Sequence, residues 1–201
     1  GPLEQAVYRL TEQTGALFVV SAGNTGEDGP RSIGSPGSAT AALTVGAVDG
    51  DDRIAEFSSR GPRLGDYAVK PDVTAPGVDI DAAVPVWQDV HYGRMSGTSM
   101  AAPHVCGAAA ILAQQHPEWK AEQIKGALLG SAEPATKVPG STDADEYAQG
   151  AGRLDVARAV SQPMTATPGN LSTHVRWPHS GPVTRTVTYT NLLDTPVTLE
   201  V

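Results

Sequence analysis

The stretch from Thr98 to Gln115 constrains the fold of this chain more than any other. It consists mostly of small and apolar residues, a composition typical of a helix that packs against neighbours on all sides. Pro103 is compatible with such a helix because it falls near the first turn. We therefore predict a helix from about Thr98 to Gln115 that is buried all around.

The residues at the start of this helix point to a possible reaction. Gly97 provides a tight turn, and two hydroxyl residues, Thr98 and Ser99, follow it. In the first turn of a helix the backbone N–H groups lack partners, and the macrodipole favours negative charge. A serine there can attack a carbonyl carbon while its own N–H helps to hold the oxyanion. The alternative is that Thr98 and Ser99 only cap a core helix, the commoner role of an isolated pair.

The first part of the chain follows an α/β pattern. Leu3–Gln13 carries apolar residues three and four positions apart, which predicts an amphipathic helix, and Gly15 suits its C-terminal end. Ala16–Val20 is a short continuous apolar run, typical of a strand buried in a parallel sheet. Ser21-Ala22-Gly23-Asn24 comes next, just past the carboxyl end of this strand, where open α/β sheets bind their ligands.

The later segments extend this pattern. We predict strands at Ala42–Val48 and Pro71–Val78, a hairpin arm at Val84–Tyr92, and helices around residues 119–128 and 154–160. After Pro163 the sequence pattern changes to alternating apolar and polar residues separated by turn residues. This pattern predicts strands joined by hairpins.

That change divides the chain near Gln162. Residues 1–162 form one unit, and residues 163–201 are interpreted as the start of a β-sandwich-like module. Its predicted strands are Leu171–Trp177, Val183–Thr190 and Thr195–Val201.

Two stretches resemble motifs of the subtilisin-like serine proteases. Gly97-Thr98-Ser99-Met100-Ala101-Ala102-Pro103-His104-Val105 is similar to the nucleophile motif of that family, and Ser21-Ala22-Gly23-Asn24 is similar to its oxyanion-hole segment. Phe57–Pro62 and Pro71–Val78 also resemble stretches that recur in the family. The resemblance implies a partial subtilisin-like three-layer fold with a parallel sheet.

The resemblance also implies roles for individual residues. Ser99 is the expected nucleophile, and Asn24 and the Ser99 N–H are the expected oxyanion donors of a serine endopeptidase that acts on peptides or proteins. The expected substrate-binding residues are Ser21, Ala22, Gly23, Gly97 and Thr98.

A base for Ser99 is not evident in the chain. In this family Asp and His precede the serine, but His91 is the single histidine before Ser99 and lacks the family's sequence context. His104 lies about 140° around the helix from Ser99 and is expected to point elsewhere. We therefore expect the C-terminal part of a catalytic domain, inactive alone and partnered by its own N-terminal part. The alternative is a non-catalytic scaffold fragment that binds the N-terminal part, another protein or itself.

Composition narrows the partners further. The chain has 14 basic and 22 acidic residues, a net charge of −8, and no basic cluster, which argues against nucleic acid and anionic membranes as partners. Its one cysteine, Cys106, is expected to be a buried packing residue. The resemblance implies secretion and no required cofactor. Calcium is a possible ligand, because Asp72 matches a weak cation position of some relatives and Asp49, Asp51 and Asp52 share a turn.

Overall fold

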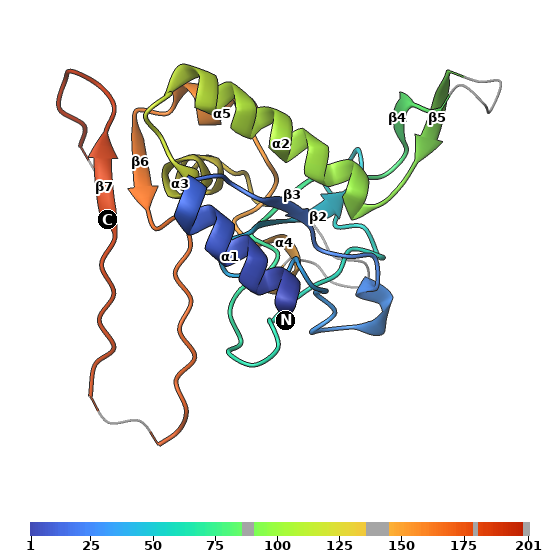
Figure 1. Ribbon diagram of the computed structural model, residues 1–201, viewed down its shortest axis with the longest axis horizontal. Coiled ribbons are helices and arrows are strands. Elements are labelled where there is room, and N and C mark those ends of the chain that lie inside the picture. Colours follow the sequence, from blue (N-terminus) through green and yellow to red (C-terminus); the bar gives the residue numbers. More distant parts are fainter. Residues whose placement is uncertain (86–90, 136–144, 179–180, 199–201) are drawn as a thin grey trace.

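Parallel strands form the centre of the molecule. A computed structural model describes residues 1–85, 91–135, 145–178 and 181–198. Within it, β1 (Val19–Ser21), β2 (Leu43–Val48) and β3 (Val73–Pro76) form a three-stranded parallel sheet in the order β1-β2-β3 (Figure 1). Val19 pairs with Leu43, and Val45 pairs with Val73. The parallel sheet of the expected α/β fold is confirmed.

The central strand β2 is buried on both faces. Leu43, Val45 and Ala47 face the main core, and none of them is exposed to solvent. Helix α2 (Thr98–Gln115) covers this face with Val105 and Leu112. Such a strand needs a nearly continuous apolar run, and Ala42–Val48 is apolar apart from Thr44.

The opposite face of the sheet is covered by α1. This helix (Pro2–Thr14) ends at Gly15, whose φ of 73° is left-handed, as the predicted C-terminal glycine requires. Its buried Val7 shares a smaller core with Phe18 and Val20. Because Val19 and Val20 point to opposite faces of the strand, α1 and α2 lie on opposite sides of the sheet.

The bounds of α2 match the prediction, but its burial does not. Its buried residues, among them Ala101, Val105 and Leu112, lie three or four positions apart and face the sheet. Ile111 is 42% exposed, and Cys106 is exposed. The predictions of all-round burial and of a buried Cys106 were therefore wrong. Small residues allow a helix to pack closely against a neighbouring element, but they do not provide an element that covers its other face.

Shorter elements complete this part of the molecule. A two-stranded hairpin, β4 (Ile80–Ala83) with β5 (Tyr92–Met95), precedes α2 and confirms a hairpin there; residues 86–90 of the predicted arm lie outside the description. The remaining elements are η1 (Gly26–Asp28), α3 (Ala121–Gly130), α4 (Glu146–Gln149) and α5 (Val156–Ser161). In the described part of the chain, every helix is too short or too polar to cross a lipid bilayer.

The C-terminal residues form one antiparallel pair, and a β-sandwich is not shown. β6 (Met164–Thr167) pairs with β7 (Thr188–Asn191), and two extended arms reach away from the body between them (Figure 1). The strand predicted at Leu171–Trp177 was wrong, and the one at Val183–Thr190 is confirmed only near its end. Residues 195–198 form no strand, and 199–201 lie outside the description. An alternating apolar and polar pattern favours a strand only where a neighbouring strand pairs with its backbone N–H and C=O groups. The boundary near Gln162 stays a prediction.

Candidate active site

The sheet edge and the start of α2 bring Ser99 and Asn24 together. Ser21 is the last residue of β1, and the chain continues through Ala22, whose N–H donates to Val45 O at 2.9 Å. Asn24 lies in the loop that follows. Thr98, the first residue of α2, joins this loop to the helix by three hydrogen bonds, so the two predicted segments form one site.

Thr98 sets the orientation of the Asn24 amide. The Thr98 N–H and hydroxyl both donate to Asn24 Oδ1, each at 2.9 Å, and Thr98 Oγ1 accepts from the Gly23 N–H at 3.2 Å. Oδ1 is thereby occupied, and Nδ2 is the amide atom left to meet a ligand. A Cβ placed on Gly97 would lie 3.4 Å from Nδ2, so this donor borders the turn before Ser99. Thr98 does not cap its own helix.

Ser99 is exposed at the N-terminal end of the 18-residue α2. In the part of the chain that the structure describes, no hydrogen bond occupies its N–H. The carbonyl of Gly97 accepts the next two amides, those of Met100 and Ala101. Ser99 N–H and Asn24 Nδ2 are therefore two donors beside one hydroxyl, at the end of a helix whose dipole favours negative charge.

The other predicted site residues surround these two. Ala22 and Thr98 are buried, whereas Ser21 and Gly23 are half-buried. Gly23 has a φ of 113°, a conformation that favours glycine. Gly97 is buried as well, so Ser21 and Gly23 are the predicted substrate-binding residues with accessible surface. The substrate-binding and catalytic roles stay predictions.

A cavity of about 320 Å³ lies beside Ser99. It is lined by Ile80 and Ala82 from β4 and by Ser99, Met100, Pro103 and His104 from α2. His104 therefore faces the same cavity as Ser99, which corrects the expectation that it points elsewhere. Side chains on a helix lean toward its N-terminus, and the His104 ring is held back over this turn by a 2.9 Å hydrogen bond between Nδ1 and Met100 O.

His104 is nevertheless not hydrogen-bonded to Ser99. A carbonyl can only accept, so Nδ1 carries the proton that bonds Met100 O. His91 lies at the far end of the hairpin, where its carbonyl accepts from Val84 N–H. Neither histidine forms the serine–imidazole pair of a working triad among the described residues.

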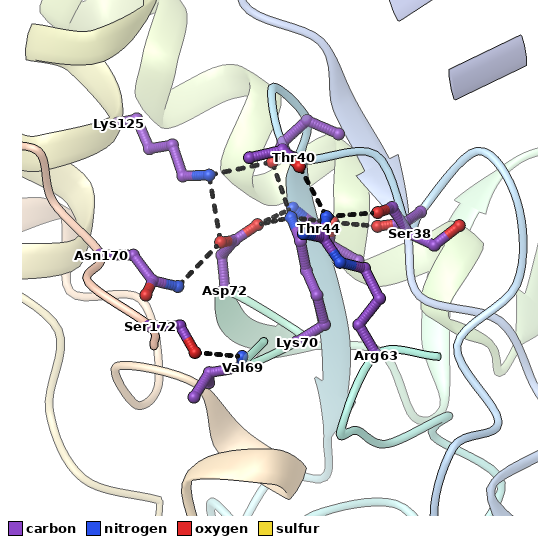
Figure 2. A network of polar contacts seen from close by, with 12 residues as sticks. Ser38, Thr40, Thr44, Arg63, Val69, Lys70, Asp72, Lys125, Asn170 and Ser172 are labelled. Carbon is purple, nitrogen blue, oxygen red and sulfur yellow. Dashed lines mark hydrogen bonds and ion pairs between the residues drawn. The ribbon is translucent and has the colours of Figure 1, made fainter. Parts of the chain in front are cut away.

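A second polar cluster lies at the start of β3, and sequence reasoning missed it (Figure 2). Asp72 is 1% exposed. Its Oδ1 accepts from Lys125 Nζ at 3.0 Å and Asn170 Nδ2 at 3.2 Å, and its Oδ2 accepts from Thr44 N–H at 2.7 Å and Lys70 Nζ at 2.5 Å. The Lys-Pro-Asp order alone could not reveal that Lys125 and Asn170 converge on the same carboxylate.

This cluster bears on the calcium prediction. Both oxygens of Asp72 already accept two hydrogen bonds each from cationic or amide donors, so this carboxylate offers no free face to a cation. Within the described ranges, no group of three or more His, Cys, Asp or Glu side chains is placed to hold a metal ion. Calcium binding stays a prediction.

Burial and charge act in opposite directions in the cluster. Burial lowers the pKa of Lys70 to about 8, although Asp72 counteracts this, and Lys125 lowers it further. Burial alone would raise the pKa of Asp72. Attraction by Lys125 and Lys70, together with hydrogen bonds from Lys70 and the Thr44 N–H, outweighs burial and lowers the pKa. The carboxylate is thus held charged between two ammonium groups.

Comparison with known proteins agrees with this geometry. The model of the "Subtilase family" matches residues 1–152. The minor extracellular protease Vpr of Bacillus subtilis is 37% identical over 154 residues, which cover 74% of this chain and 18% of Vpr. Pyrolysin of Pyrococcus furiosus is 42% identical over 138 residues, or 55% of this chain and 10% of pyrolysin.

A solved structure gives the same result. The prenylagaramide maturation protease PagA has a TM-score of 0.64 and 30% identity, covering 78% of this chain and 54% of PagA. The chain thus spans less than a fifth of Vpr and pyrolysin and about half of PagA. On the family match and the shared fold, this chain belongs to the subtilase family of serine proteases.

Proposed function

We propose that this chain carries the nucleophile and the oxyanion donors of a secreted serine endopeptidase. The observation that carries this is a pair of donors without an acceptor among the described residues, Asn24 Nδ2 and Ser99 N–H, beside an exposed Ser99 hydroxyl at the start of α2. Secretion is supported by the likeness to Vpr, which is named as an extracellular protease. Ser21 and Gly23 supply accessible surface for the substrate, and the buried Gly97 supplies the backbone turn before Ser99.

The proposed reaction is acyl transfer from a peptide to Ser99 and then to water. Ser99 Oγ bonds to the scissile carbonyl carbon and loses its proton to a base, while the carbonyl oxygen becomes an oxyanion between Asn24 Nδ2 and Ser99 N–H. The C–N bond breaks, the base returns the proton to the leaving amine, and water then hydrolyses the ester. Loss of an oxyanion asparagine costs about 10²–10³ in kcat, a figure measured in subtilisin, a relative of this chain.

The base in this proposal comes from the N-terminal part of the same catalytic domain. The apolar cavity beside Ser99 is open to receive a base-bearing segment between β4 and α2. The exposed face of α2, with Pro103, His104 and Ile111, continues from that cavity without a charged residue. We propose that the N-terminal part covers both, that the chain alone is close to inactive, and that a separate unit begins near Gln162.

A second candidate function is a non-catalytic scaffold. It is favoured by the same exposed face of α2, and by the absence of a hydrogen bond between Ser99 and a histidine among the described residues. In that case the chain binds the N-terminal part or another protein, and Ser99 is idle.

A fluorophosphonate probe and a peptide substrate distinguish these functions. We expect slow labelling of the chain alone, and fast labelling and hydrolysis when the N-terminal part is supplied. Both should vanish with Ser99→Ala. The matched control is Ser96→Ala, which removes a nearby exposed hydroxyl that accepts from Asp79 N–H.

Two results would contradict the proposal. Binding of the N-terminal part without hydrolysis would support the scaffold. Rapid labelling of the chain alone that is lost in His104→Ala would show that His104 is a local base, so that the N-terminal part is not needed for attack.

A further inference from the structure

A buried loop outside the proposed donors holds the oxyanion segment in place. Ser58 and Ser59 are adjacent, and neither has solvent exposure. Ser59 faces the loop that carries Asn24, whereas Ser58 faces the core strand β2, where its Oγ accepts from Ala47 N–H at 3.0 Å. These two neighbouring hydroxyls therefore serve different parts of the molecule.

Ser59 contacts the residues on both sides of Asn24. Its N–H donates to Gly23 O at 3.0 Å, and its Oγ accepts from Thr25 N–H at 3.1 Å. Thr25 Oγ1 lies 3.2 Å from the same oxygen and donates to Ser32 O at 3.3 Å, so Ser59 is the donor between the two hydroxyls. The hydroxyl of Ser59 thus has both a donor and an acceptor in the loop.

These bonds restrict the backbone at Asn24. A Cβ placed on Gly23 would lie only 2.8 Å from Ser59 Oγ, which shows how closely the two segments approach. Thr98 holds the Asn24 side chain from the helix, and Ser59 holds Gly23 and Thr25 from the opposite side. With the peptide units before and after Asn24 both fixed, the direction of Nδ2 depends on Ser59 as well as on Thr98.

We infer that Ser59 is a positioning residue for the oxyanion hole, acting through Asn24. This inference rests on the proposed endopeptidase function. Donors must be fixed before charge develops on the carbonyl oxygen, because reorganisation during the reaction cancels part of the stabilisation. Without the Ser59 hydroxyl, Thr25 N–H loses its acceptor, and Asn24 Nδ2 is free to shift away from the oxyanion.

The test compares Ser59→Ala with Ser58→Ala in the full-length protein that contains this chain. Each change removes one fully buried hydroxyl that accepts a backbone N–H, so the two should lower the melting temperature alike. We expect Ser59→Ala to lower kcat by roughly ten- to a hundredfold with little change in KM, since small misplacements of reacting groups have effects of this size. Ser58→Ala should keep kcat near the wild-type value.

A double-mutant cycle shows whether Ser59 acts through Asn24. If it does, Ser59→Ala should have almost no further effect on kcat in an Asn24→Ala background. Equal losses of kcat in Ser59→Ala and Ser58→Ala, or a full additional loss on top of Asn24→Ala, would overturn the inference.

Hydrogen exchange separates this inference from the proposed function. The amides of Thr25 and Thr98 should exchange faster in Ser59→Ala than in Ser58→Ala, whether or not the protein hydrolyses peptides. If the wild-type protein hydrolyses nothing, the endopeptidase proposal fails on that measurement. Unchanged exchange at Thr25 and Thr98 would instead overturn the positioning role, even in an active enzyme.

Discussion

The substitution Asp72→Asn should be strongly destabilising, although it preserves the shape of the side chain. In the native protein the carboxylate lies between Lys70 Nζ at 2.5 Å and Lys125 Nζ at 3.0 Å, and the exposed fractions of all three side chains are below 10%. An asparagine there would leave two buried ammonium groups without a counter-charge and would turn an N–H₂ group toward one of them.

The expected loss can be given an order of magnitude. Removing one partner of a buried ion pair costs about 3–5 kcal/mol in the free energy of unfolding. Domains are stable by only about 5–15 kcal/mol, so Asp72→Asn would leave the protein near its unfolding limit. At about 2–4 °C for each kcal/mol in a chain of this size, the melting temperature should fall by roughly 6–20 °C.

Thermal melts in a Ser99→Ala background, which prevents self-digestion, measure this loss. The control is Asp81→Asn, which removes a carboxylate paired with Arg94 on the surface, where both side chains are more than 60% exposed. It should leave the melting temperature near the starting value. Lys125→Met should recover part of the loss when combined with Asp72→Asn. A fall no larger than that of Asp81→Asn would refute this account of the cluster.

Three further changes test other contacts. Folding lowers the pKa of Lys70 from 10.5 to about 8, so between these pH values the unfolded chain binds this proton more than the folded protein does. The free energy of unfolding should therefore rise with pH in that range. Thermal melts of Lys70→Met should lack this rise. Asn170→Asp replaces a hydrogen-bond donor to Asp72 by a second carboxylate, and the repulsion should loosen the chain there. Limited proteolysis after residue 169 should therefore be faster in Asn170→Asp than in Asn170→Ala. Gly126→Ala should lower the melting temperature, because its methyl would overlap the carbonyl of Ala166; a rise of the kind seen at exposed helix glycines would contradict that contact.

Local patterns in the sequence predicted the helices and the central strand well. The α2 bounds, the left-handed Gly15 and the buried strand at Ala42–Val48 all depend on short-range spacing. The placement of Asn24 near the start of α2 was also expected, from the resemblance of both segments to motifs of the subtilisin-like proteases.

Several features could not be predicted because they depend on contacts between distant residues. Lysines are usually exposed, and nothing near Lys125 in the chain signals that it reaches Asp72. The strand at Leu171–Trp177 failed because alternation does not provide a neighbouring strand. Cys106 is exposed because the apolar composition of α2 does not determine how many neighbours surround it.

The sequence by itself therefore determined the elements that carry the proposed reacting groups: Ser99 at a helix start and Asn24 after a strand. Only the tertiary structure decided how those groups are held. The orientation of the Asn24 amide is set by Thr98 and its loop is held by Ser59, and Asp72 is neutralised by two lysines. The physical reason is range: helix and strand formation follow spacing within a few residues, whereas hydrogen bonds across loops and buried ion pairs exist only after distant segments have packed together.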